Sequence, residues 1–152
     1  MGSILVLFHS QAHGNTAAMA EAVAEGARDA GADARLVNTN EQRMDIEAYR
    51  GVDAVAFGSP DYYGYIAGGL KVFLDDWYIA KQSDEAGLTG KPYVLFYSHG
   101  GGGAVVGPLE KLFDRMGTQV GQTIGSRGSP DDRTREACRQ LGRDLAEQAS
   151  RK

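Results

Sequence analysis

The sequence is poor in cysteine and has no long apolar run. Cys138 is its one cysteine, so the chain can form neither an internal disulfide nor a cysteine-rich metal site, which favours a reducing compartment. The longest apolar run, residues 4–8, is much shorter than the roughly 20 residues that cross a bilayer. No charged segment with a cleavage site is recognisable at the N-terminus. We therefore expect a cytoplasmic protein with no membrane insertion.

The sequence also lacks a dense basic stripe. Residues 1–126 hold 9 lysines and arginines against 15 aspartates and glutamates, and residues 127–152 hold 7 against 5, for a formal net charge of −4. Nucleic-acid-binding domains concentrate basic residues on one face, so no nucleic-acid partner is expected. With 42% hydrophobic and 24% charged residues, the composition is typical of one globular domain, which we expect to span residues 1–152.

Apolar runs alternate with helical periodicity along the chain, which predicts βαβ units and a parallel sheet. Three nearly continuous apolar segments are typical of central strands that helices cover on both faces. Two shorter segments with polar residues suit the sheet edges. The predicted central strands are residues 4–8, 54–58 and 93–98, and the predicted edge strands are residues 34–37 and 119–124. The expected fold class is α/β, a three-layer, doubly wound, five-stranded parallel sheet of order 2-1-3-4-5.

Apolar residues recur at helical spacing between these strands. The apolar stripes occupy residues 19–27, 70–77 and 109–116. A last helix is expected to begin with Ser129 as its cap and Pro130 at its first position, a pattern typical of helix N-termini. The arginines of this last helix are expected to face water. Residues 38–52 and 81–92 are predicted to be surface connections.

The segment after the first predicted strand is a hydroxyl-containing turn that leads directly into a helix. A helix N-terminus offers backbone N–H groups and the positive end of the helix dipole to an anion. Residues 9–16 contain no lysine or arginine, so they lack the ending of a triphosphate-binding loop. This pattern predicts a monophosphate site with neutral donors, and the alternative is a plain strand-to-helix turn. The candidate contacts are Ser10, Ala12, His13, Gly14, Asn15 and Thr16.

Two further loops, after the third and fourth predicted strands, have unusual compositions. Residues 58–69 hold three tyrosines, whose flat faces suit stacking on an aromatic ring system. Residues 98–104 hold four successive glycines, which suits close approach of the backbone to a ligand. The alternatives are tyrosines that cover the sheet end or a subunit interface, and a disordered glycine tip. The candidate contacts are Pro60, Asp61, Tyr62, Tyr63, Gly64, Tyr65, Ser98, His99, Gly100, Gly101, Gly102 and Gly103.

The three loops follow strands that are neighbours in the predicted sheet, so they are expected to meet at one cleft beyond the carboxyl ends of those strands. At these residues the chain resembles the flavodoxin superfamily, and most closely the tryptophan-repressor-binding-protein family of FMN-dependent NAD(P)H:quinone oxidoreductases. Residues 14–16 and the helix after them resemble that family's phosphate loop. Residues 58–60 and 63–64, with the helix that follows, resemble its flavin loop. The resemblance spans nearly the whole chain.

The resemblance implies a flavodoxin-like fold with FMN as cofactor, its phosphate on residues 10–16 and its isoalloxazine between residues 60–65 and 98–103. It also implies NAD(P)H as the electron donor and a small acceptor such as a quinone. The flavin would perform the chemistry, no catalytic side chain is assigned, and His99 is the single candidate for one; no metal site is expected. Gln11 departs from the family pattern, which has a hydroxyl residue at this position.

Two other hypotheses for the function remain open. One is a flavodoxin-type electron carrier that serves a redox protein partner, and the other is a flavin-free binding module. The sequence also leaves open whether the chain forms a homo-oligomer.

Overall fold

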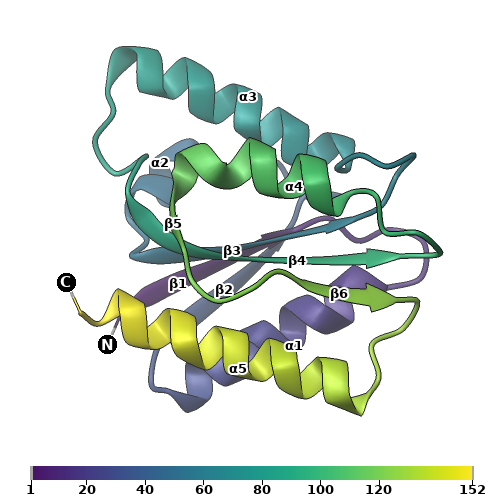
Figure 1. Cartoon of the computed structure of the whole chain (residues 1–152). Coiled ribbons are helices and arrows are strands. Elements are labelled where there is room, and N and C mark those ends of the chain that lie inside the picture. The colour runs from purple at the N-terminus through teal and green to yellow at the C-terminus, as the bar shows by residue number, and fades with distance from the viewer. Residues whose placement is uncertain (1, 152) are drawn as a thin grey trace.

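A computed structural model describes residues 2–151 as three layers, with a parallel sheet between two layers of helices (Figure 1). The sheet order is β2-β1-β3-β4-β5, and β6 also pairs with β4. The strands are β1 (Ser3–Phe8), β2 (Asp33–Asn38), β3 (Ala54–Pro60), β4 (Lys91–His99), β5 (Gly117–Gln119) and β6 (Ile124–Arg127). The helices are α1 (Asn15–Asp29), α2 (Ile46–Arg50), α3 (Gly68–Ser83), α4 (Val106–Phe113) and α5 (Asp132–Ala149), with a short 3-10 helix at Asp114–Met116. The predicted fold class and strand order are confirmed.

The two faces of the sheet bury separate apolar clusters because side chains alternate along each strand. Ile4, Val6 and Phe8 of β1 pack with α1 and α5, whereas Leu5 and Leu7 pack with α2, α3 and α4. Burial on both sides explains the nearly continuous apolar runs of the central strands. Within residues 2–151, no helix is long and apolar enough to cross a bilayer.

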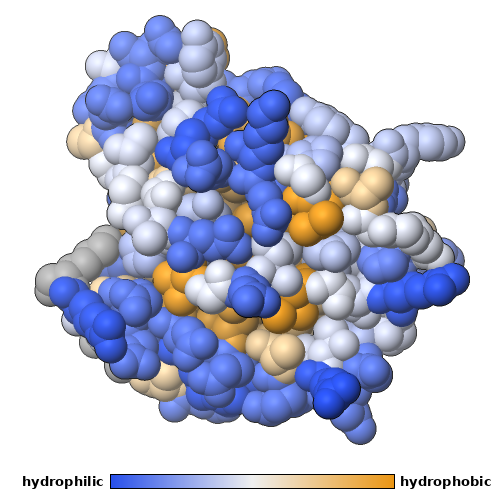
Figure 2. Space-filling model, viewed as in Figure 1, coloured by the Kyte–Doolittle hydropathy of each residue, from blue (hydrophilic) through white to orange (hydrophobic). Residues whose placement is uncertain are grey.

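The predicted fifth strand, residues 119–124, is wrong in its bounds. β5 pairs with the first part of β4 and β6 with the last part, so residues 120–123 form a break between two short strands. Gly121 has a φ of +67° and turns the chain inside this break. Val120 in the break and Ile124 at the start of β6 both pack against the core, which explains the strand-like pattern of residues 119–124. Figure 2 shows apolar side chains along this edge, between α4 and α5, framed by polar ones. A broken edge strand is a poor template for pairing with another chain.

The two predicted surface connections are shorter than expected. Residues 38–52 contain α2, which begins after Asp45, whose side chain accepts a hydrogen bond from the Glu47 N–H at 2.9 Å. In the second connection, residues 81–83 belong to the end of α3 and residues 91–92 to the start of β4. Trp77 Nε1 donates to the Leu88 carbonyl at 2.8 Å, and both side chains are buried. This contact fixes the remaining connection beneath α3.

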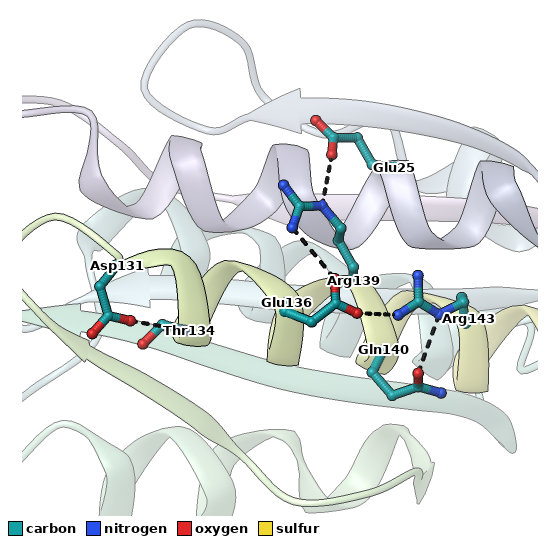
Figure 3. Close-up of polar contacts among 7 residues, drawn as sticks. All are labelled: Glu25, Asp131, Thr134, Glu136, Arg139, Gln140 and Arg143. Atoms are coloured by element: carbon teal, nitrogen blue, oxygen red, sulfur yellow. Dashed lines mark hydrogen bonds and ion pairs between the residues drawn. The ribbon is translucent and has the colours of Figure 1, made fainter.

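The cap of α5 is Asp131, so the prediction of Ser129 as the cap and Pro130 as the first helical residue is wrong. The Asp131 carboxylate accepts a hydrogen bond from the Thr134 N–H at 2.8 Å, and this bond lowers the pKa of that carboxyl (Figure 3). The carboxylate satisfies one of the free N–H groups of the first turn, which a proline ring cannot do.

Of the four arginines of α5 that were expected to face water, Arg133 is exposed, whereas Arg135, Arg139 and Arg143 are half-buried. Arg139 and Arg143 form ion pairs. Arg139 Nε lies 3.0 Å from Glu25 Oε2 of α1, and Arg139 and Arg143 both contact Glu136 (Figure 3). These groups remain open to solvent, so the pairs contribute little to stability. Only the Arg139–Glu25 pair joins α5 to α1, whose contact also includes buried apolar side chains.

Cys138 lies on the buried face of α5 and is completely inaccessible to solvent. Burial raises the pKa of its thiol to about 12, and the thiolate is the reactive form of cysteine. We expect iodoacetamide to modify the native protein very slowly at mildly alkaline pH and the denatured chain completely, as measured by mass spectrometry. Modification of the native protein as fast as that of an unfolded control would contradict this burial.

Candidate functional site

A cleft of about 300 Å³ lies beyond the carboxyl ends of β1, β3 and β4, at the end of the sheet toward which the arrows of β4 and β6 point in Figure 1. Segments from all three predicted loops meet there. The lining residues are Ser10, Gln11, Ala12, His13, Gly14, Asn15, Thr16, Pro60, Asp61, Tyr62, Ser98, His99, Gly100 and Gly128.

The remaining predicted residues do not line this cleft. They flank it on the hairpin after β3 and in the loop before α4, and they are Tyr63, Gly64, Tyr65, Gly101, Gly102 and Gly103. Conversely, Gly128 lines the cleft and was not predicted. Its N–H donates to the His99 carbonyl at 2.8 Å, because β6 runs beside the end of β4. The sequence offered no signal for Gly128, since the position of β6 was not recognised.

The loop after β1 is fixed from both sides. Asn38, at the end of β2, pairs its side-chain amide with the backbone N–H and carbonyl of Ser10, both at 3.0 Å. The Ser10 hydroxyl accepts a hydrogen bond from the Ala17 N–H of α1 at 3.2 Å. Gly14 precedes α1 with a φ of +72° and carries no side chain that could cap the helix. The loop therefore presents the start of α1 to the cleft in a preorganised form.

Thr16 connects this loop to the end of β4. Its side chain is 2% exposed, and its hydroxyl oxygen lies 2.7 Å from the hydroxyl oxygen of Ser98. A hydroxyl can donate one hydrogen bond and accept others, so this pair retains capacity for a ligand in the cleft. Thr16 and Ser98 are far apart in sequence, and only the fold brings them together.

The tyrosine loop forms a tight hairpin. Tyr62 and Tyr65 exchange two backbone hydrogen bonds of 3.0 and 3.1 Å. Tyr63 and Gly64 between them have φ angles of +57° and +74°, the signature of a type I′ turn. A positive φ is costly for tyrosine, and the Tyr63 ring is fully exposed to solvent. The hairpin thus holds an aromatic ring out at the edge of the cleft.

Asp61 ties this hairpin to the third loop. Its carboxylate accepts hydrogen bonds from the Gly64 N–H at 2.7 Å and from the Val105 N–H at 3.2 Å. The two bonds hold the hairpin beside the segment that leads into α4. This bridging role was not predicted, because a carboxylate next to tyrosines carries no sequence signal for distant backbone donors.

The third loop packs over the end of β4. The His99 ring stacks on Tyr97 with centroids 5.8 Å apart, and its Nδ1 is buried without a hydrogen-bond partner among the described residues. A Cβ on Gly103 would lie 3.3 Å from both rings, which explains a glycine there. His99 lines the cleft, and within residues 2–151 no group is found that would relay a proton to its Nδ1.

The cleft carries little charge. Among the described residues that line it, Asp61 is the one carboxylate and none is a lysine or arginine. Within residues 2–151, no group of histidine, cysteine, aspartate and glutamate side chains is arranged to hold a metal ion. Any anionic group in the cleft would be bound by neutral hydroxyl and backbone N–H donors.

Comparisons with known proteins identify the family and agree with the fold. The family model described as "Flavodoxin" matches residues 6–142. "Flavodoxin" of Aquifex aeolicus is 32% identical, with 97% of this chain and 86% of that protein aligned. "NAD(P)H dehydrogenase (quinone)" of Archaeoglobus fulgidus is 29% identical, with 99% of each aligned. The crystal structure of a WrbA-like flavodoxin from Agrobacterium tumefaciens shares the fold, with a TM-score of 0.81 and 24% identity over 99% of this chain and 98% of that one.

These matches confirm the resemblance to the flavodoxin superfamily that was inferred from the sequence. The chain therefore belongs to the flavodoxin family of FMN-binding proteins.

Proposed function

We propose that the cleft holds FMN and that the protein is an oxidoreductase that accepts hydride from NAD(P)H and reduces a quinone or a similar flat acceptor. The observation that carries this proposal is the hairpin of exposed tyrosines beside a cleft with almost no charge. FMN supplies the redox chemistry when it is bound. The chain itself binds the cofactor, orients it and shapes access to it.

The residues at one end of the cleft fit the phosphate of FMN. Ser10, Asn15 and Thr16 line the cleft around the N-terminus of α1, and the described residues of this lining include no lysine or arginine. Such neutral donors suit a monophosphate at a helix N-terminus. A triphosphate would call for the lysine of a nucleotide-binding loop.

The residues at the other end fit a planar ring. Tyr62 lines the cleft and is 38% exposed, and Gly100 faces it from the third loop. Backbone N–H groups of the glycine loop would stabilise negative charge on a reduced ring, and the Gly64 carbonyl of the hairpin could accept a hydrogen bond from it. The neighbouring Tyr63 and Tyr65 leave room for a second flat molecule to stack beside the cofactor.

An electron carrier for a protein partner is the second candidate, and the Aquifex aeolicus flavodoxin favours it. Docking between redox proteins is steered by surfaces of one charge sign. A net charge of −4 over 152 residues and an uncharged aromatic hairpin fit a small planar substrate better than such a partner.

Anaerobic stopped-flow mixing with NADH and with NADPH tests the enzyme directly. We expect at least one of them to reduce the bound FMN within seconds, seen as loss of the flavin's visible absorption, and benzoquinone to restore it. Free FMN at the same concentration is the control for reaction in solution. If neither nucleotide reduces the bound flavin while one-electron dyes do, the carrier is the correct assignment.

The cofactor preference is tested by titrating the apoprotein with FMN, riboflavin and FAD. We expect FMN to bind at least about tenfold more tightly than riboflavin, because its phosphate gains charge-assisted hydrogen bonds from the loop after β1. FAD is expected to bind weakly, since the chain offers no second nucleotide motif. Equal affinities for FMN and riboflavin would show that the cleft does not bind the phosphate.

A further inference from the structure

His9 is the first residue of the loop after β1, and its ring contacts Tyr62 of the tyrosine hairpin. It is 7% exposed and does not line the cleft itself. Its Nδ1 lies 2.9 Å from the Thr39 hydroxyl oxygen, and its Nε2 lies 2.9 Å from Gln11 Oε1. Both ring nitrogens are therefore engaged, one on each side of the ring.

The same Gln11 oxygen also meets the hairpin. The Tyr62 hydroxyl donates to Gln11 Oε1 in a long hydrogen bond of 3.5 Å. The His9 and Tyr62 rings also contact each other at 81°, with centroids 6.0 Å apart, the edge-to-face arrangement that aromatic rings prefer. His9 thus contacts Tyr62 directly and also through Gln11, and both of these partners line the cleft.

The direction of these hydrogen bonds follows from the acceptor they share. Gln11 Oε1 can only accept, so the proton of the neutral His9 ring lies on Nε2. His9 Nδ1 then accepts from the Thr39 hydroxyl. Gly69 at the start of α3 makes room for this pair, because a Cβ there would lie 2.5 Å from the Thr39 hydroxyl oxygen and 3.0 Å from His9 Nδ1.

We propose that His9 is a positioning residue that holds Tyr62, directly and through Gln11, at the angle required by the ring end of the cleft. The proposal rests on FMN binding in this cleft. It gives Gln11 a role that differs from the phosphate contact of the family's usual hydroxyl. The two ring nitrogens connect Thr39 to Gln11, and the ring and Gln11 both contact Tyr62 of the hairpin.

Titration of apoprotein variants with FMN and with riboflavin tests the proposal. Riboflavin carries the ring but not the phosphate, so His9→Phe is expected to weaken both ligands by the same factor, about three- to tenfold. His9→Gln is expected to recover most of the affinity, because its amide can donate to Gln11. If His9→Phe weakens the binding of FMN but not of riboflavin, His9 supports only the phosphate loop. If neither affinity changes, His9 has no role in flavin binding. Either result overturns the proposal.

A double-mutant cycle tests whether His9 acts on the Tyr62 hydroxyl through Gln11, as distinct from the direct ring contact. Tyr62→Phe removes only the hydroxyl, and its effect on riboflavin binding is expected to vanish in the His9→Phe background. If the effects of the two substitutions on riboflavin affinity are additive, His9 does not act on Tyr62 through Gln11.

Nitrogen NMR of the His9 ring in the apoprotein supplies a measurement that needs neither flavin nor a folded variant. We expect the neutral ring to be protonated at Nε2, whereas protonation at Nδ1 would overturn the arrangement. If the wild-type protein binds no flavin while this tautomer is observed, the proposed function fails and the ring geometry stands.

Discussion

Replacement of Gly26 or Gly142 by alanine is expected to lower the free energy of unfolding by about 3 kcal/mol. The backbones of α1 and α5 touch at these glycines on one face of the sheet (Figure 1). A Cβ on Gly26 would lie 1.8 Å from the Arg139 carbonyl oxygen, and one on Gly142 would lie 2.0 Å from that of Val23. The helices would have to move apart and open the apolar layer between them.

Urea and thermal unfolding measure this loss, and Gly107→Ala is the matched control. Gly107 lies in α4 with nothing within 4 Å of its Cβ position, so alanine there is expected to be neutral or to stabilise by up to about 1 kcal/mol. If Gly26→Ala and Gly107→Ala have the same stability, the two helices do not cross at the distance described.

The second large effect is expected for Thr16→Val, which should weaken FMN binding by about 1 to 3 kcal/mol. Valine keeps the shape of the side chain and removes the hydroxyl that would bond the phosphate. It also leaves the buried Ser98 hydroxyl without its partner at 2.7 Å, so the apoprotein is expected to lose about 1 kcal/mol of stability.

Calorimetric titration with FMN and with riboflavin measures the binding effect. Thr16→Ser retains the hydroxyl and is the control, with an FMN affinity expected to be near that of the wild type. Riboflavin binding should change little in either variant, because it has no phosphate. An unchanged FMN affinity in Thr16→Val would show that Thr16 serves only to join α1 to β4.

Local patterns predicted the sheet order well because a strand that is buried on both faces has a nearly continuous apolar sequence. They failed at the start of α5, where Ser129 was chosen as the cap by residue type although Asp131 is the cap, and at residues 120–123, where the partly buried Val120 extends the apolar pattern of β6. At residues 120–123 the outcome depends on which part of β4 each short strand pairs with, and that pairing is not a local property.

The sequence by itself determined the layered α/β class, the central strands and the three loops that carry the cleft, because each depends on residue types close together in the chain. Only the tertiary structure decided which side chains bond one another there. The Thr16–Ser98 pair, the Asn38 support of Ser10 and the His9 contacts join residues from different strands and loops. Their partners are chosen by strand register and loop packing to within a few tenths of an ångström, and no local sequence pattern records distances of that kind.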